Sequence, residues 1–376
     1  MKVLVVGEVY SSNLGDGIIC EVVDGLLKNQ FETSFVDLSG RKEFEIIRTD
    51  YEKFSYLKSE IRYVKSIIKS YLHKLGYKKS GGNLSVIIQN FIEEFNKKIS
   101  NFSPDLIFFA GGQMFIEAFV NQILYVCDFA EVNKIPVFFN ACGIGNLDSQ
   151  SVQKVKKILN SDSVEFISVR DGIESFRKLS QKEIIDTYDT AILSKYYYSI
   201  DSNVKNELGI GIMLSSLQSV RYQINFWDQL LQSLVAQNIN FKVFTNGSKQ
   251  DYLFAKYLLD RNGIELANLV AKPNYPHELV QTISSFKAII SMRLHSLIVA
   301  YSLNVPTIAI SWDNKVKTFY EKIGSSQSCY ELIEPISSIM DNLEEKLKYQ
   351  YNEDKKKSIE TSILKNFEVI KNCRLG

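Results

Sequence analysis

The sequence lacks the cysteine patterns that mark disulfide scaffolds and zinc sites. Its five cysteines stand apart from one another, with no CxxC pair and no other metal-ligand spacing. They are Cys20, Cys127, Cys142, Cys329 and Cys373. This scatter argues against a disulfide-stapled fold and against bound zinc, and it fits a reducing compartment. We therefore expect a cytoplasmic protein without a metal site.

An excess of one charge and a long apolar run are also missing. The 44 Lys and Arg residues balance 43 Asp and Glu residues, and the net charge of +1 gives no support for nucleic acid as a partner. The apolar run at residues 3–6 is too short for a signal peptide, and no run approaches the roughly 20 residues that cross a bilayer. We expect a protein that is neither exported nor membrane-spanning by its own signals, with any anion site confined to one place.

The remaining composition is that of a globular protein, with 45% hydrophobic and 23% charged residues. A chain of 376 residues is about twice the usual domain length. Expected strands and helices alternate in two series, residues 1–195 and 208–376, with a helical insertion over about 41–100. A tyrosine-rich polar segment joins the two series. Such alternation predicts two α/β domains with parallel sheets.

The loop after the first expected strand is where a dinucleotide-binding fold carries its glycine motif. Residues 10–17 lack GxGxxG, which argues against a nicotinamide cofactor. The loop does carry Asn13 and Asp16. Asp16 is a candidate ligand contact, and the alternative is that it caps the helix that begins there.

Two later strands end in residues of similar interest. The apolar run at residues 104–110 leads into Gly111, Gly112 and Gln113, and paired glycines let a ligand or another backbone approach closely. A tight structural turn would need the glycines equally. The run at residues 166–169 ends in Arg170, which we expect to point toward the carboxyl edge of the sheet.

The segment Arg293, Leu294 and His295 follows a buried apolar run and opens an expected helix. A helix start at the carboxyl end of a parallel strand favours an anion, arginine matches carboxylate or phosphate, and histidine exchanges protons near neutral pH. The alternative is that Arg293 pairs with a neighbouring helix and His295 caps its own. Lys315, in the first turn of a later helix, also favours an anionic ligand weakly.

Residues 58–79 combine apolar positions at helical spacing with seven basic residues. A helix of this kind can lie on an anionic membrane surface. A solvated surface helix shows the same pattern more often. Peripheral contact with the inner membrane surface is therefore one of two open interpretations.

An ordered set of motifs along residues 1–325 resembles the polysaccharide pyruvyl transferase family. The set comprises Asn13-Leu14-Gly15-Asp16, Asp105 with Gly111-Gly112, Gly143-Ile144-Gly145, Ser168-Val169-Arg170-Asp171, Asp189, Arg293-Leu294-His295 and Asp313-Asn314-Lys315. The resemblance implies a GT-B-like architecture, two Rossmann-type domains facing a central cleft. It also implies transfer of a pyruvyl group from phosphoenolpyruvate to a sugar of a cell-surface polysaccharide, an exopolysaccharide or capsule, or to its lipid-linked precursor, forming a pyruvate ketal.

On this resemblance, the donor would be held from both domains. Arg293, Leu294, His295 and Lys315 would bind it from the second domain and Arg170 from the first, and no cofactor or metal is required. Catalysis would fall to His295, as the proton carrier, with Arg293 and Arg170. The acceptor sugar would contact Asn13, Asp16, Gly111, Gly112 and Gln113.

Two positions depart from the family pattern. Gln113 stands where a third glycine is expected, which bears on the acceptor pocket, and Gly17 stands where a larger polar residue is frequent. Two other functions remain open in the same architecture. One is a glycosyltransferase that uses a nucleotide sugar, with Arg293 and Lys315 on the diphosphate, and the other is a non-catalytic binding protein.

Overall fold

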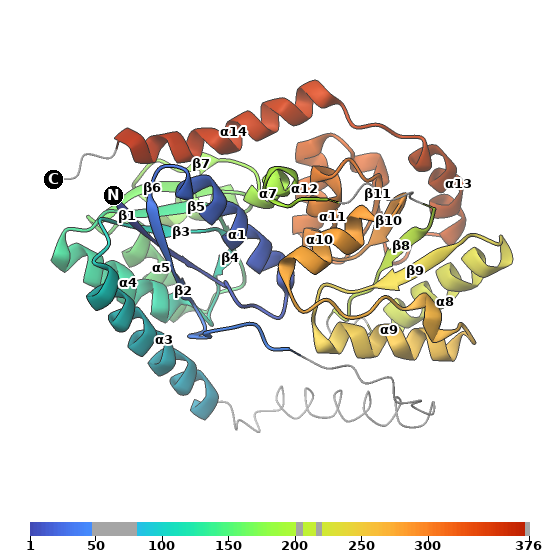
Figure 1. Ribbon diagram of the computed structural model, residues 1–376, viewed down its shortest axis with the longest axis horizontal. Helices are drawn as coiled ribbons and strands as arrows, with labels where there is room; N and C mark the ends of the chain where they lie inside the picture. The colour runs from blue at the N-terminus through green and yellow to red at the C-terminus, as the bar shows by residue number, and fades with distance from the viewer. Residues whose placement is uncertain (47–80, 201–205, 216–219, 373–376) are drawn as a thin grey trace.

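The computed structural model describes residues 1–46, 81–200, 206–215 and 220–372. Two α/β domains lie next to each other in Figure 1, each built on one parallel sheet. The basic segment expected at residues 58–79 lies outside the described residues, so the membrane interpretation stays a prediction.

The first sheet forms because short apolar runs alternate with amphipathic helices. Its strands are paired in parallel in the order β2-β1-β3-β5-β6-β7, and β4 pairs with β5. They are β1 (Lys2–Gly7), β2 (Glu32–Asp37), β3 (Leu106–Phe109), β4 (Gly112–Phe115), β5 (Val137–Ile144), β6 (Val164–Val169) and β7 (Ile185–Asp186). Strands such as β3 are buried at every residue, which requires helices on both faces of the sheet.

The helices of the first domain cover these faces. They are α1 (Leu14–Lys28), α3 (Gly81–Phe102), α4 (Val120–Asn133), α5 (Ser149–Leu159), α6 (Ile173–Leu179), the 3-10 turn η1 (Thr190–Leu193) and α7 (Ser194–Tyr197). α3 packs beside α4, where the rings of Phe95 and Phe129 meet edge to face. The insertion expected over residues 41–100 thus ends in a helix that belongs to the domain.

The second sheet repeats the plan with the strand order β12-β11-β10-β8-β9. Its strands are β8 (Leu208–Gly211), β9 (Phe241–Phe244), β10 (Ala288–Ser291), β11 (Thr307–Ser311) and β12 (Cys329–Glu331). Its helical elements are α8 (Val220–Ala236), α9 (Lys249–Arg261), η2 (Leu266–Asn268), α10 (Pro276–Ser284), α11 (Leu294–Ser302), α12 (Asn314–Ile323), η3 (Ser326–Ser328), α13 (Ile336–Leu347) and α14 (Glu353–Asn372).

The last helix, α14, runs from the second domain back over the first (Figure 1). The ring of Phe367 lies 5.5 Å from that of Phe108 in β3. The buried amide of Asn366 donates to Ser168 Oγ and Thr187 Oγ1 at 3.3 and 3.1 Å. The expected second series, residues 208–376, therefore contains a helix that packs on the first sheet.

Some expected strand boundaries differ from the structure. The apolar segment at residues 269–271 could be taken for a strand, but it forms only an isolated bridge from Leu269 to Val243. The glycine turn before β4 has positive φ at Gly111 (112°) and Gly112 (90°), values that favour glycine. That turn lets the chain resume as β4 beside β5, a strand that we did not predict.

Candidate active site

The carboxyl ends of strands from both sheets meet at the boundary between the domains. Arg170 follows β6 and Asp189 lies just after β7, while His295 lies in the first turn of α11 after β10. Open parallel sheets bind ligands at this edge. The convergence of Arg170 and His295 that the sequence led us to expect is present in the structure.

Arg170 is a buried cation held between two carboxylates. Its Nη1 forms an ion pair with Asp189, and its Nε lies 3.3 Å from Asp171 Oδ2. Burial by itself would lower the pKa of the guanidinium, but the carboxylates of Asp189 and Asp171 outweigh it and raise that pKa. Arg170 is therefore a permanently charged group with a fixed orientation.

The same Nη1 lies 3.2 Å from Nε2 of His295. A guanidinium N–H only donates, so Nε2 must accept, and the proton of the neutral imidazole resides on Nδ1. Burial lowers the pKa of His295. The Asp16 carboxylate opposes this shift, and the Arg170 charge reinforces it. His295 is thus a neutral imidazole whose Nδ1 lies 3.9 Å from Asp16 Oδ1.

The first turn of α1 brings Asp16 to the imidazole because Gly15 has no side chain. A Cβ at Gly15 would lie 2.2 Å from Nδ1 of His295, closer than any real contact. Across the boundary, Leu14 N–H donates to Asn246 O at 3.0 Å. The sequence motif included Gly15, but we had not predicted a role for it. In the structure, Gly15 allows the two domains to approach closely.

Asp16 does not cap its helix. The N-cap position is Asn13, and the Asp16 carboxylate instead accepts from Asn13 Nδ2 at 2.8 Å and from Ser11 Oγ at 3.4 Å. A Cβ at Gly112 would lie 3.7 Å from Asp16 Oδ1, so the glycine turn is beside the same carboxylate. These expected acceptor-side residues are therefore gathered together.

Gln113 and Lys315 join the two sides of the cleft. Lys315 Nζ donates to Gln113 Oε1 at 2.6 Å and lies 3.3 Å from Asp313 Oδ2. Gln113 stands where the family pattern has glycine, and a glycine could not form this hydrogen bond between the two domains. Gly17, the other departure, is also a close approach, because a Cβ there would lie 3.0 Å from Pro276 of the second domain.

Arg293 forms its contacts within the second domain. Its Nε donates to Asp251 Oδ2 at 2.9 Å, and Asp251 lies in the first turn of helix α9. This arrangement matches the alternative in which Arg293 pairs with a neighbouring helix. Burial raises the pKa of Asp251, and the Arg293 charge opposes that shift. The Arg293 side chain keeps 22% of its surface exposed, and its donor-binding role stays a prediction.

A small cavity of about 20 Å³ lies in the cleft, lined among others by Arg170, Leu294, Lys315 and Lys322. This volume holds about one water molecule. Sequence reasoning missed Lys322, whose Nζ reaches from α12 to the carbonyl oxygens of Arg170 (2.9 Å) and Thr187 (2.8 Å). A lysine in the last turn of an amphipathic helix carries no local signal for such a contact.

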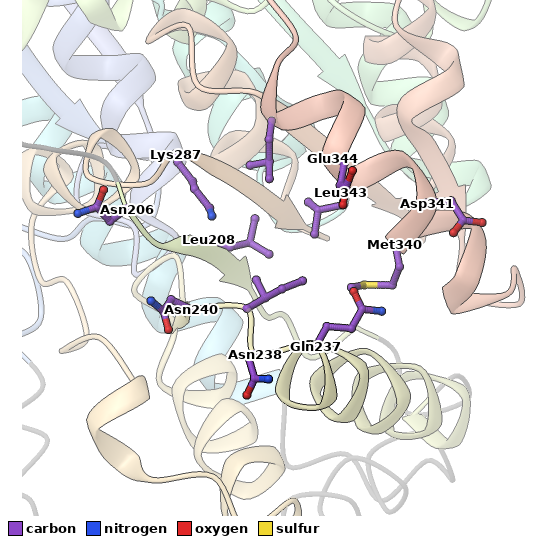
Figure 2. A pocket seen from close by; sticks show the side chains of 12 residues that line it. Asn206, Leu208, Gln237, Asn238, Asn240, Lys287, Met340, Asp341, Leu343 and Glu344 are labelled. Carbon is purple, nitrogen blue, oxygen red and sulfur yellow. The ribbon is translucent and has the colours of Figure 1, made fainter.

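Another pocket, of about 690 Å³, lies at the opposite edge of the second sheet (Figure 2). Leu208 and Lys287 stand there at the amino ends of β8 and β10, and Met340 and Glu344 of α13 face them. The groups expected to react are all at the carboxyl edge. We therefore place the candidate active site in the cleft and not in this pocket.

The two parallel-sheet domains and the cleft between them define the chain as an α/β protein of the GT-B-like class, as expected. Within the described residues, every helix is too short or too polar to cross a membrane. A comparison with curated protein sequences finds no match. A family profile, described as polysaccharide pyruvyl transferase, matches residues 13–314. The chain belongs to the polysaccharide pyruvyl transferase family, which supports a transferase that modifies polysaccharide.

Solved structures similar to this chain include UDP-GlcNAc 2-epimerases. The enzyme from Neisseria meningitidis bound to UDP-GlcNAc has a TM-score of 0.57 at 14% identity, covering 99% of this chain and 100% of that one. S. aureus MnaA with UDP has a TM-score of 0.56 at 11% identity, covering 96% and 91%. The enzyme from Methanocaldococcus jannaschii has a TM-score of 0.50 at 10% identity, covering 94% of each chain. At these identities the likeness concerns the fold alone.

Proposed function

We propose that the protein transfers the pyruvyl group of phosphoenolpyruvate to a sugar of a cell-surface polysaccharide or of its lipid-linked precursor, forming a pyruvate ketal. The observation that carries the proposal is the contact between Arg170 and His295 across the domain boundary, next to Asp16. An anion-binding group and a proton carrier, one from each domain, are what this chemistry needs.

Cations and a free helix end supply the donor site. Phosphoenolpyruvate carries a phosphate and a carboxylate, and charge-assisted hydrogen bonds to such groups contribute roughly 1.5 to 3 kcal/mol each. Arg170 and Lys315 line the cleft cavity. At the start of α11 the N-cap residue, Arg293, makes no side-chain cap bond among the described residues, so the first N–H groups of the helix are available to an anion.

The reaction requires two proton movements. Two sugar hydroxyls attack the enol carbon, one of their protons is delivered to the adjacent methylene carbon, which becomes a methyl group, and the other leaves with the phosphate. Asp16 can accept a proton from a hydroxyl. The neutral His295 can relay a proton if it takes one up at Nε2, once Arg170 no longer donates to that nitrogen, and releases the proton on Nδ1, the nitrogen that faces Asp16. Asp189 and Asp171 fix Arg170, which in turn fixes the imidazole.

The cleft must widen before the donor enters, because a cavity of about 20 Å³ has room for about one water molecule. Several interdomain contacts besides that of Arg170 with His295 would have to separate or shift. They include Gln113 with Lys315, Leu14 with Asn246, and Lys322 with Arg170. Closure around the donor would then exclude water from the reacting atoms.

Phosphate release from phosphoenolpyruvate, measured against a panel of sugar acceptors, tests the proposal. His295→Ala should abolish most turnover and leave donor binding within a few-fold, whereas Arg293→Ala should weaken donor binding itself. His277→Ala, at another histidine of the second domain, is the matched control. Near-normal turnover in His295→Ala would refute the proton role. A nucleotide sugar that raises the melting temperature where phosphoenolpyruvate does not would favour a glycosyltransferase.

A reaction without a metal and peripheral contact with the membrane are two further predictions. Activity that survives exhaustive chelation would support a reaction without a metal. Flotation with anionic liposomes, with and without residues 58–79, tests peripheral membrane contact. Flotation that does not depend on this segment, or does not occur, would contradict that contact.

A further inference from the structure

Helix α12 of the second domain presents one face to the first domain. Four of its residues line the cleft cavity, namely Lys315, Thr318, Phe319 and Lys322. Their spacing of three, four and seven residues places them on the same side of the helix. The other side packs into the second domain, where Val316 and Tyr320 are buried and the Tyr320 hydroxyl donates to Thr307 Oγ1. A contact from the cleft face of α12 to the first domain is therefore a contact between the domains.

The ammonium group of Lys322 is fully bonded to the first domain. Its Nζ donates to the carbonyl oxygens of Arg170 at 2.9 Å and Thr187 at 2.8 Å, and it forms an ion pair with Asp186. A lysine ammonium has three N–H donors, so each donor has an acceptor here. The three acceptors belong to the ends of β6 and β7, two neighbouring strands of the first sheet. One side chain thus fastens α12 to two strand ends.

These bonds leave Lys322 without a donor for a ligand while the cleft is closed. The cavity that Lys322 lines has a volume of about 20 Å³, enough for about one water molecule. A donor with a phosphate and a carboxylate fits only after α12 has moved away from β6 and β7. Because Lys322 must then give up its three acceptors, its bonds favour the closed cleft over the open one.

We propose that Lys322 is a positioning residue that latches the empty cleft, holding α12 against the ends of β6 and β7 until a donor opens it. The same residue that offers its carbonyl oxygen to Lys322, Arg170, places its Nη1 3.2 Å from His295 Nε2. The latch therefore also keeps the two halves of the candidate active site together. This inference rests on the proposed function for the identity of the donor, and it adds what controls the donor's entry.

The test compares Lys322→Met with Lys317→Met in the full chain. Methionine keeps an unbranched side chain and removes the charge. Lys317 is on the same helix but pairs with Glu331 of β12 inside the second domain, so it is the matched control. Lys322→Arg is the conservative variant, because it restores a cation that can donate to the same oxygens. Asp186→Asn, at a half-exposed position, weakens the latch from the other domain.

Opening of the cleft is measured without any donor, as the rate at which diethyl pyrocarbonate modifies His295, followed by mass spectrometry. His295 is 7% exposed, whereas His277 is exposed and serves as a reference in the same chain. Cys127, which is buried in α4, reports on unfolding through its reaction with an alkylating reagent. Stopped-flow tryptophan fluorescence then gives the association rate of phosphoenolpyruvate, because Trp312 lies just before α12.

We expect His295 to react about tenfold faster in Lys322→Met than in the wild type, the factor that one charge-assisted hydrogen bond contributes to an equilibrium. His277 and Cys127 should react at unchanged rates. Lys317→Met should match the wild type, Lys322→Arg should lie closer to the wild type than Lys322→Met, and Asp186→Asn should show a smaller increase. Phosphoenolpyruvate should associate faster with Lys322→Met and bind no more weakly.

An unchanged His295 rate in both Lys322→Met and Asp186→Asn, or an equal increase in Lys317→Met, would overturn the latch. Alkylation of Cys127 that accelerates as much as the His295 reaction would mean unfolding and would also overturn it. Weaker phosphoenolpyruvate binding by Lys322→Met would make Lys322 a donor ligand instead. A wild type that does not bind phosphoenolpyruvate would reject the proposed function, whereas the His295 rate, which needs no donor, would still decide on the latch.

Discussion

Replacing Asp189 by asparagine should destabilise the first domain strongly. Asparagine keeps the shape of the side chain and the oxygen that accepts from Ala191 N–H at 2.8 Å, so the change removes mainly the negative charge. That charge is 3% exposed and pairs with Arg170, whose side chain is 6% exposed. Removing one partner of a buried ion pair costs about 3 to 5 kcal/mol, because the other charge stays buried without compensation.

Thermal unfolding measures this loss. For a domain of 150–250 residues each kcal/mol lowers the melting temperature by about 2 to 4 °C, so we expect a decrease of about 6 to 20 °C. Asp171→Asn, which removes the more exposed partner on Nε, should lower it less. Adding Arg170→Gln to Asp189→Asn should recover part of the loss, because both charges are then gone. A melting temperature within 1 or 2 °C of the wild type in Asp189→Asn would refute the assignment of Asp189 as the residue that holds Arg170.

Three other predictions follow from single contacts. Gly15→Ala, normally favourable in a helix, should instead lower turnover because the new methyl group displaces His295, and unchanged kinetics would contradict that close approach. Phe367→Ala should lower the free energy of unfolding by about 3 to 5 kcal/mol, because α14 loses its packing against Phe108. Hydrogen exchange in α14 should become faster, and unaltered exchange would contradict the packing. Burial, and after it the charge of Asp16, raises the pKa of Glu8 to about 8. Between about pH 4.5 and pH 8 the folded state therefore keeps a proton that the unfolded state has lost, and the free energy of unfolding falls as the pH rises through this range. Glu8→Gln should then gain melting temperature relative to the wild type between pH 5 and pH 9, whereas a constant difference would contradict the shift.

Sequence reasoning pointed to the sheet edges at which the candidate site lies, because the parallel strands of a sheet bring their carboxyl ends to one side. Strand direction places Arg170 and His295 each at the carboxyl edge of its own sheet. The family resemblance, which implies two domains facing a cleft, led us to expect that these edges face each other. The direction of each side chain depends on partners far away in the sequence. Arg293 illustrates this limit, since its partner Asp251 is 42 residues distant and lies in a helix whose local pattern indicates only a cap.

The return of α14 to the first domain could not be predicted for a similar reason. Its amphipathic pattern requires an apolar surface but does not specify which one. Phe367 packs against Phe108, and the amide of Asn366 donates to hydroxyl groups near the ends of β6 and β7. Short strands such as β7, with two residues, fall below the length at which alternation can be recognised.

The most direct test of the central claim is long-range ¹H–¹⁵N NMR of the histidine rings, because the chain has only three histidines and His295→Gln would assign the relevant signals. At neutral pH we predict a neutral His295 ring with its proton on Nδ1, and a change in its signals, but not in those of His277, when phosphoenolpyruvate is added. A charged ring, a proton on Nε2, or signals that stay unchanged at saturating phosphoenolpyruvate would contradict the account.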